Sequence, residues 1–199
     1  MPTFCRVLLI SGSTRAGSTN TAVLRTAAAV APPGLTTVMY GGLADLPAFN
    51  PDDDHEPLHP VVADLRRQLD AADAVLFCTP EYAGALPGSF KNLLDWTVGE
   101  GMYDKPAAWL NVSSVAAPTA GADAHASLAK VLGYVSADIV QAACARALMT
   151  RAAVGPDGLV TDTDVRDPAD RGPPGTRAPR GAEGRTHAWA PLKTTSGTP

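Results

Sequence analysis

The chain has 199 residues, 45% of them hydrophobic, and a formal net charge of −4 at pH 7. This length and composition predict one globular domain with its own core, plus room for a short additional segment. The acidic balance argues against a nucleic-acid partner, and the apolar run at 7–10 is far too short for a membrane-spanning helix, which needs about 20 residues.

Over the first 163 residues, runs that favour strands alternate with helix-like stretches. In chain order, the hydrophobic pattern predicts a strand at 3–10, a helix at 18–31, a strand at 35–40 and a helix that begins at Pro60. It then predicts a strand at 74–78, a helix at 87–98, a strand at 107–112, a helix at 121–135 and a strand that begins at 138. In the helix at 87–98 we expect one buried stripe, formed by Phe90, Leu93, Leu94 and Val98.

The predicted strands are apolar on both faces, which is the pattern of a parallel sheet between two layers of helices. Regular alternation of strand and helix also indicates an α/β fold, a doubly wound parallel sheet in a three-layer α/β/α sandwich. Residues 164–199 differ, because they are rich in proline, glycine and arginine and hold few large apolar side chains. We therefore expect a folded domain at 1–163 and a disordered tail at 164–199.

The cysteines indicate a reducing compartment. Cys5, Cys78 and Cys144 form no CxxC pair and leave an odd count, which disfavours both a disulfide framework and a structural zinc site. The first residues also lack the basic start and small-residue cleavage site of a secretory signal. We expect a cytoplasmic protein without a metal centre.

The loop between the first strand and the first helix is a candidate phosphate-binding loop. Its hydroxyl, amide and guanidinium side chains belong to Ser13, Arg15, Ser18, Thr19 and Asn20. Because the first turn of a helix exposes unpaired N–H groups and the positive end of the helix dipole, anions bind there. The alternative interpretation of the same residues is an ordinary helix cap.

The loop lacks the sequence features of two common classes of nucleotide-binding site. Ser18 follows Gly17 where a nucleotide-hydrolysing P-loop carries lysine. The GxGxxG fingerprint of dinucleotide-binding folds is absent, and no acidic residue ends the strand at 35–40 to hold a ribose. A monophosphate such as that of FMN fits better, because hydroxyls and amides can surround it with little countercharge. Arg15 could serve this phosphate or a nicotinamide 2′-phosphate.

Two further loops follow the third and fourth strands, at the sheet edge where doubly wound folds bind ligands. The loop at 79–88 offers the ring of Tyr82 and the carboxylate of Glu81 beside two prolines, and a planar heteroaromatic ligand could lie against it. Glu81 is equally well explained as a turn residue bonded to the backbone, and Tyr82 as packing at the edge of the core. The loop at 113–121 is a weak signal, whose value comes only from its position.

Other candidate chemistry has less support. His55 and His59 lie four residues apart, but in a Pro- and Asp-containing loop rather than on one face of a helix. No GxSxG motif indicates a hydrolase. Cys78, at the end of a predicted strand, is either a reactive thiol near the site or a buried structural one.

Taken together, these loops resemble a known family. GSTRAGSTN at 12–20, TPEYAGALPG at 79–88 and KNLLDW at 91–96 resemble the NAD(P)H-dependent FMN reductase family, which includes quinone, azo-dye and chromate reductases. The resemblance covers roughly residues 4 to 140. It implies a flavodoxin-like fold, an FMN cofactor, NADPH or NADH as co-substrate, and a homodimer.

The resemblance also implies which residues bind the cofactor. The family's FMN-phosphate loop matches Ser13, Arg15, Ser18, Thr19 and Asn20. The segment along the isoalloxazine ring matches Pro80, Glu81, Tyr82, Ala83 and Gly84, and a third flavin-side loop falls near Ser113 and Gly121. We expect no catalytic side chain in the usual sense, because the flavin carries the chemistry.

Two features depart from the family pattern. Position 83 is Ala where many relatives carry Asn, so a contact at the flavin edge or with the acceptor is expected to be missing. After residue 162 the family closes with an amphipathic helix packed on the sheet, whereas this chain continues into the Pro/Gly/Arg-rich segment. We therefore expect one face of the sheet to be less well covered.

The predicted function is an FMN-dependent NAD(P)H oxidoreductase that passes a hydride from nicotinamide to flavin and then to a quinone, flavin or similar small-molecule acceptor. Two alternatives stay open: an FMN-binding flavodoxin-like electron-transfer module, and a tailoring reductase that acts on a specific aromatic or quinone intermediate. Consumption of NAD(P)H separates the first from the second. The range of acceptors separates the first from the third.

Overall fold

The computed structural model describes residues 5–114 and 117–161. The strands are β1 (Cys5–Ser11), β2 (Leu35–Tyr40), β3 (Ala74–Thr79), β4 (Pro106–Ser113), β5 (Asp138–Ile139) and β6 (Ala145–Leu148). The α-helices are α1 (Thr19–Ala29), α2 (Pro60–Asp70), α3 (Gly88–Asp95) and α4 (Ala122–Tyr134). The predicted tail at 164–199 lies outside the described residues.

The sheet is parallel throughout, in the order β2-β1-β3-β4-β5. β6 is also parallel to β4: β5 pairs with Pro106 and Ala107, and β6 pairs further along, from Leu110 to Ser113. The last position of the sheet is thus one edge strand interrupted by the short 3₁₀ turn Gln141–Ala143. This order is that of a flavodoxin-like, doubly wound fold, and the predicted fold class is confirmed.

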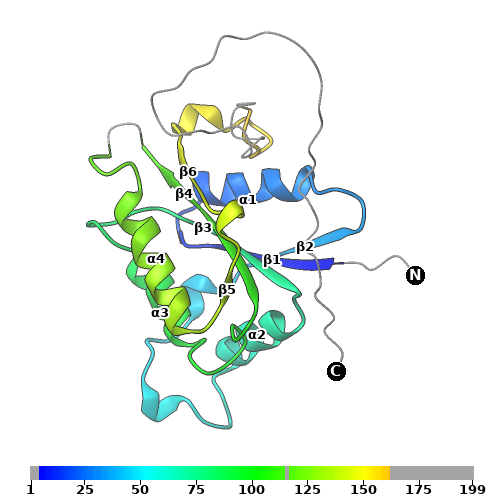
Figure 1. Cartoon of the computed structure of the whole chain (residues 1–199), viewed down its shortest axis with the longest axis vertical. Coiled ribbons are helices and arrows are strands. Elements are labelled where there is room, and N and C mark those ends of the chain that lie inside the picture. The colour runs from blue at the N-terminus through cyan, green and yellow to red at the C-terminus, as the bar shows by residue number, and fades with distance from the viewer. Residues whose placement is uncertain (1–4, 115–116, 162–199) are drawn as a thin grey trace.

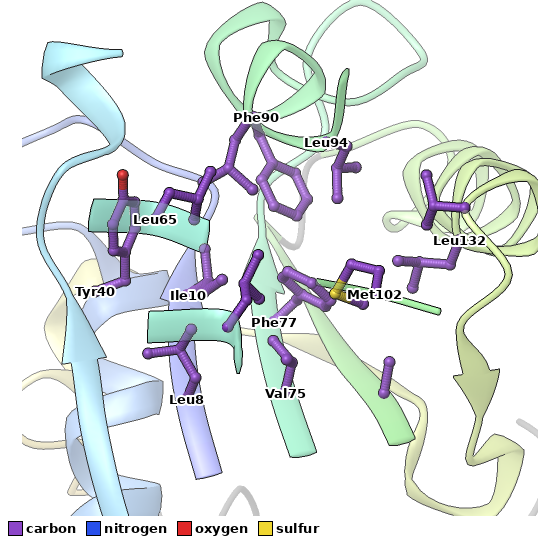
Figure 2. Packing of buried hydrophobic residues seen from close by; sticks show 14 of the residues in the cluster. Leu8, Ile10, Tyr40, Leu65, Val75, Phe77, Phe90, Leu94, Met102 and Leu132 are labelled. Atoms are coloured by element: carbon purple, nitrogen blue, oxygen red, sulfur yellow. The ribbon is translucent and has the colours of Figure 1, made fainter. Parts of the chain in front are cut away.

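Two helical layers enclose the sheet, with α2, α3 and α4 on one face and α1 on the other (Figure 1). Alternate residues of each strand serve the two layers, because successive side chains of a strand point to opposite faces. In β1, Leu8 and Ile10 pack against α2 and α3, while Val7 and Leu9 pack towards α1. Figure 2 shows the three-helix side, where Phe77 of β3 meets the ring of Phe90 at a centroid distance of 5.5 Å.

The helix boundaries follow local signals, with one correction. Pro60 begins α2 as predicted, and the His59 ring caps it because Nδ1 accepts a hydrogen bond from the Val61 N–H at 3.4 Å. α3 ends at Asp95, so the prediction that Val98 belongs to its buried stripe is wrong, and Val98 is 54% exposed. Trp96 follows the helix as its C-cap residue and is buried in the core, where its Nε1 donates to the Pro47 carbonyl at 3.0 Å.

The face that α1 covers has the lighter helical layer. Among the described residues α1 is the only α-helix on it, and the segment after β5 supplies the remaining cover. A small hollow of about 70 Å³ lies there, lined mostly by apolar side chains of β1, β3 and β4 together with Val140 and Ala143. Within the described part of the chain, no helix combines the length and apolar character needed to cross a bilayer.

Candidate functional site

The loop after β1 turns the chain directly into the first turn of α1. Ser18 is the N-cap residue, and its hydroxyl oxygen accepts a hydrogen bond from the Asn20 backbone N–H at 3.2 Å. Gly17 precedes it with φ of +66°, which glycine adopts without strain. The cap interpretation is therefore correct. It does not compete with anion binding, since other N–H groups of the first turn stay available.

Hydrogen bonds within this loop hold it in one conformation. The Ser11 hydroxyl oxygen accepts from the Ser13 N–H at 3.3 Å and from the Thr21 hydroxyl at 3.0 Å. The Ser13 hydroxyl oxygen accepts from the Arg15 N–H at 3.4 Å. Among the described residues Arg15 forms no salt bridge. The loop thus presents a free guanidinium beside a helix N-terminus.

The Asn20 side chain is held by a hydrogen bond from Cys78 of β3. The Asn20 residue is 3% exposed and Cys78 is fully buried at the end of β3. The Cys78 thiol donates to the Asn20 side-chain oxygen at 3.3 Å, and burial raises the pKa of that thiol. Cys78 is therefore a structural, protonated thiol rather than a reactive one. Its hydrogen bond leaves the Asn20 amide nitrogen without a partner in the described part of the chain.

The first and second loops approach each other closely at Gly12. The Gly12 N–H donates to the Cys78 carbonyl at 2.8 Å. A Cβ added at Gly12 would lie 2.3 Å from the Thr79 hydroxyl oxygen, so only glycine fits between the two strand ends.

The second loop is a two-residue hairpin turn. Tyr82 and Ala85 exchange both backbone hydrogen bonds at 3.0 Å, and between them Ala83 and Gly84 have φ of +51° and +69°. Two positive φ values in succession are typical of a type I′ turn. The turn leaves the Tyr82 residue 48% exposed.

Glu81 ties this turn to α4. One carboxylate oxygen accepts from the backbone N–H groups of Asp123 and Ala124, both at 3.0 Å, and the other accepts from the Thr119 hydroxyl. The Thr119 bond lowers the pKa of the Glu81 carboxyl, and the two backbone bonds act in the same direction against its partial burial. A negative charge at a helix N-terminus is also favourable. Glu81 thus bonds to the backbone, as one sequence interpretation held, but to a helix 42 residues further on.

The third loop begins at Ser113, the last residue of β4. Its hydroxyl is buried and has no hydrogen-bond partner within the described residues. Gly121, with φ of +79°, lies against it: a Cβ there would be 2.6 Å from the Ser113 hydroxyl oxygen. Residues 115 and 116 of this loop lie outside the described residues.

The three loops line one hollow of about 460 Å³ that is open to solvent. The predicted site residues that line it are Ser13, Arg15, Ser18, Thr19, Asn20, Pro80, Glu81, Tyr82 and Ser113. Ala83 and Gly84 form the turn beside it, and Gly121 lies behind Ser113.

A fourth segment, which the sequence did not indicate, completes the hollow. Met149, Thr150 and Arg151 line it directly after β6. The Met149 N–H donates to the Ser113 carbonyl at 2.9 Å, which fixes this segment to the end of β4. A strand assignment at 145–148 would have found it, because residues that follow a parallel strand reach the same edge of the sheet.

These residues fit a phosphate monoester with a planar ring. The capped helix start, with the unpaired guanidinium of Arg15 beside it, suits a phosphate. The exposed Tyr82 ring gives a flat surface, and the unpaired Ser113 hydroxyl suits a polar group of the ligand, since a buried hydroxyl without a partner is costly. No cluster of three or more metal-ligating side chains occurs in the described residues.

A protein-family model matches most of the chain. The model described as NADPH-dependent FMN reductase matches residues 5–147, well over half of the chain. The chain belongs to this family. The matched range holds all three predicted loops, whereas Met149, Thr150 and Arg151 lie beyond its end.

Individual relatives agree with this membership. An NAD(P)H-dependent FMN reductase of Pseudomonas aeruginosa is 39% identical over 123 residues, 60% of this chain and 66% of the relative. A quinone reductase of Escherichia coli is 36% identical over 92 residues, 46% of this chain and 49% of the relative. The matched part of this chain thus spans about half to two thirds of the length of these two relatives.

A solved structure shares the fold over most of the chain. The flavoenzyme NAD(P)H:(acceptor) oxidoreductase from Paracoccus denitrificans superposes with a TM-score of 0.70 at 29% identity. The superposition covers 81% of this chain and 89% of that one. The flavodoxin-like architecture and the predicted family are therefore both confirmed.

Proposed function

We propose that the chain is an FMN-dependent NAD(P)H oxidoreductase, which takes electrons from NADPH or NADH and passes them to a quinone, flavin or similar small acceptor. One observation carries the proposal: a single hollow joins a capped helix N-terminus, an exposed aromatic ring and an unpaired buried hydroxyl, from Ser18, Tyr82 and Ser113. Membership of the FMN reductase family supports it independently.

The side chains of the hollow divide into those that hold the ligand and those that hold the loops. FMN, when bound, supplies the two-electron chemistry. The start of α1 and the Arg15 guanidinium bind its phosphate, and the Asn20 amide nitrogen adds a donor beside them. Glu81 holds the Tyr82 turn against α4, which sets one wall of the hollow before any ligand arrives.

The absorption spectrum of the purified protein, after loading with FMN and desalting, tests cofactor binding. A retained flavin band is the expected result, followed by oxidation of NADH or NADPH in the presence of a quinone. Folded protein that retains no flavin would contradict the proposal. Retained flavin without NAD(P)H oxidation with any quinone would favour an electron-transfer module instead.

We further propose that the protein works as a homodimer in the cytoplasm. Support for a dimer comes from two tyrosines, Tyr103 at 73% and Tyr134 at 82% exposure, because exposed aromatic rings are enriched at interfaces. A hydrogen bond from the Asp104 N–H to the Ser136 carbonyl at 2.8 Å joins the segments that carry them. Three free cysteines fit a reducing compartment. Light scattering after size-exclusion chromatography tests the dimer, and a monomer at micromolar concentration would contradict it.

A further inference from the structure

Arg151 lies close to the candidate phosphate-binding loop in space, although more than 130 residues separate it from that loop in the sequence. It opens the 3₁₀ turn Arg151–Ala153 after β6 and lines the same hollow as Arg15. A Cβ added at Gly17 would lie 3.6 Å from an Arg151 guanidinium nitrogen. The guanidinium is therefore beside the residue that immediately precedes the Ser18 cap.

The backbone that carries Arg151 is anchored on both sides. Before it, Met149 is buried and bonded to the end of β4. After it, the chain folds back so that the Val160 N–H donates to the Thr26 hydroxyl oxygen at 2.8 Å, and Val160 is fully buried. Figure 1 shows this segment beside α1, drawn in yellow after β6. The anchoring places the start of the arginine side chain near the start of α1.

Two cationic side chains line the hollow among the described residues, those of Arg15 and Arg151. Neither forms a salt bridge with a carboxylate in the described part of the chain. Of the acidic side chains, Glu81 lines the hollow, but its carboxylate is held by Thr119 and by the start of α4. A phosphate monoester carries a charge of about −1.5 to −2 at pH 7. One arginine and a helix N-terminus, worth about half a charge, supply about +1.5 together, which matches the lower of these charges and falls short of the higher by about half a charge.

We propose that Arg151 is a second cationic ligand of the FMN phosphate, in addition to Arg15. This rests on the proposed FMN site. The guanidinium lies beside Gly17, which immediately precedes the Ser18 cap of α1, and this position assigns it to the phosphate end of the ligand. The C-terminal segment of the described chain thereby becomes part of the cofactor site, although it lies beyond the range that the family model matches.

Comparison of FMN with riboflavin isolates the phosphate, because riboflavin has the same ring and ribityl chain without it. Flavin-fluorescence titration gives the Kd of both ligands for the wild-type protein, Arg151→Gln and Arg151→Lys. The matched control is Arg67→Gln, which removes an equal charge from α2 on the other face. For Arg151→Gln we expect the Kd for FMN to rise roughly tenfold, with the Kd for riboflavin within about twofold of wild type. Arg151→Lys should recover part of the loss, since it keeps the charge without the planar fork.

Three results would overturn the assignment. The first is an FMN Kd for Arg151→Gln no different from that of Arg67→Gln. The second is an equal weakening of FMN and riboflavin, which would show a general effect on the hollow. The third is unchanged FMN binding with a raised KM for NADPH but not for NADH, which would assign Arg151 to the dinucleotide. Wild-type protein that binds riboflavin as tightly as FMN would refute the phosphate site itself, and so is distinguishable from all three.

Discussion

Replacing Ala83 with Asn should stabilise the protein, because the backbone at this position is in the left-handed region. Ala83 has φ of +51° in a turn whose two outer residues, Tyr82 and Ala85, exchange both hydrogen bonds. An L-residue with a Cβ pays about 1 to 2 kcal/mol in that conformation, and Asn pays less because its short polar side chain can bond locally. Asn-Gly is the preferred pair of a type I′ turn, and Gly84 already supplies the second half.

We therefore expect Ala83→Asn to raise the free energy of unfolding by about 1 kcal/mol. For a domain of this size that corresponds to a rise in Tm of about 2 to 4 °C. Thermal and urea unfolding of the flavin-free protein measure both quantities. Ala83→Gly should be close to neutral, because the relief of strain is offset by the larger backbone entropy of glycine in the unfolded chain, about 0.5 to 1 kcal/mol.

The control for an Ala→Asn change as such is Ala71, which is exposed and has φ of −74° at the end of α2. Ala71→Asn should alter the unfolding free energy by no more than about 0.5 kcal/mol. The strain argument is refuted if Ala83→Asn leaves stability unchanged or lowers it while the control behaves as expected. An altered KM for the acceptor without a change in stability would support the missing-contact interpretation of position 83 instead.

Three further substitutions test the neighbouring loops. Ser113→Ala should leave the flavin-free protein as stable as wild type or more so, because the buried hydroxyl has no partner within the described residues. The same substitution should weaken FMN binding severalfold in a fluorescence titration. Loss of stability would show that the hydroxyl has an unrecognised partner. Glu81→Gln should cost about 1 kcal/mol at pH 7 through the weakened cap of α4. Because folding lowers the pKa of Glu81, its contribution is present above the ordinary value of 4.5 and lost as pH falls through the lower folded pKa, so urea midpoints of the two proteins should converge in acid. Gly12→Ala places a Cβ 2.3 Å from the Thr79 hydroxyl oxygen and should cost more than about 2 kcal/mol, whereas Gly41→Ala, which meets no atom within 4 Å, should not.

The parts of the fold that the sequence predicted well are those set by local patterns. The first four strands and the four helices were placed within about three residues, because apolar runs and helical spacing mark buried elements. β6 escaped prediction, since its sequence ARAL shows no strand preference and it exists by pairing with β4. Missing β6 also hid Arg151, the residue proposed as a second ligand of the phosphate.

The hydrogen-bond partners of the site side chains could not be predicted from the sequence, for a different reason. Glu81 could be predicted to lie at the carboxyl edge of the sheet, but its partners are N–H groups on α4, reached only through tertiary packing. Likewise, nothing in a linear pattern indicates that Cys78 bonds to the Asn20 side chain from beneath. Such contacts depend on which loops meet, and that is decided by the register of β1, β3 and β4.

This register also brings the loops of the site together at one edge of the sheet. Ser11 pairs with Cys78, and Thr79 pairs with Asn111, so the carboxyl ends of three neighbouring strands meet at one edge of the sheet, with β4 running furthest to Ser113. Glu81 then fixes the second loop to α4, while Cys78 fixes Asn20 at the start of α1. Groups held in this way lose little conformational freedom on binding, so more of the interaction free energy is available as affinity. Within the described residues three buried side-chain atoms have no hydrogen-bond partner, and Ser113 is the one of these residues that lines the hollow. Its hydroxyl is then the group that gains most if a polar ligand atom reaches it.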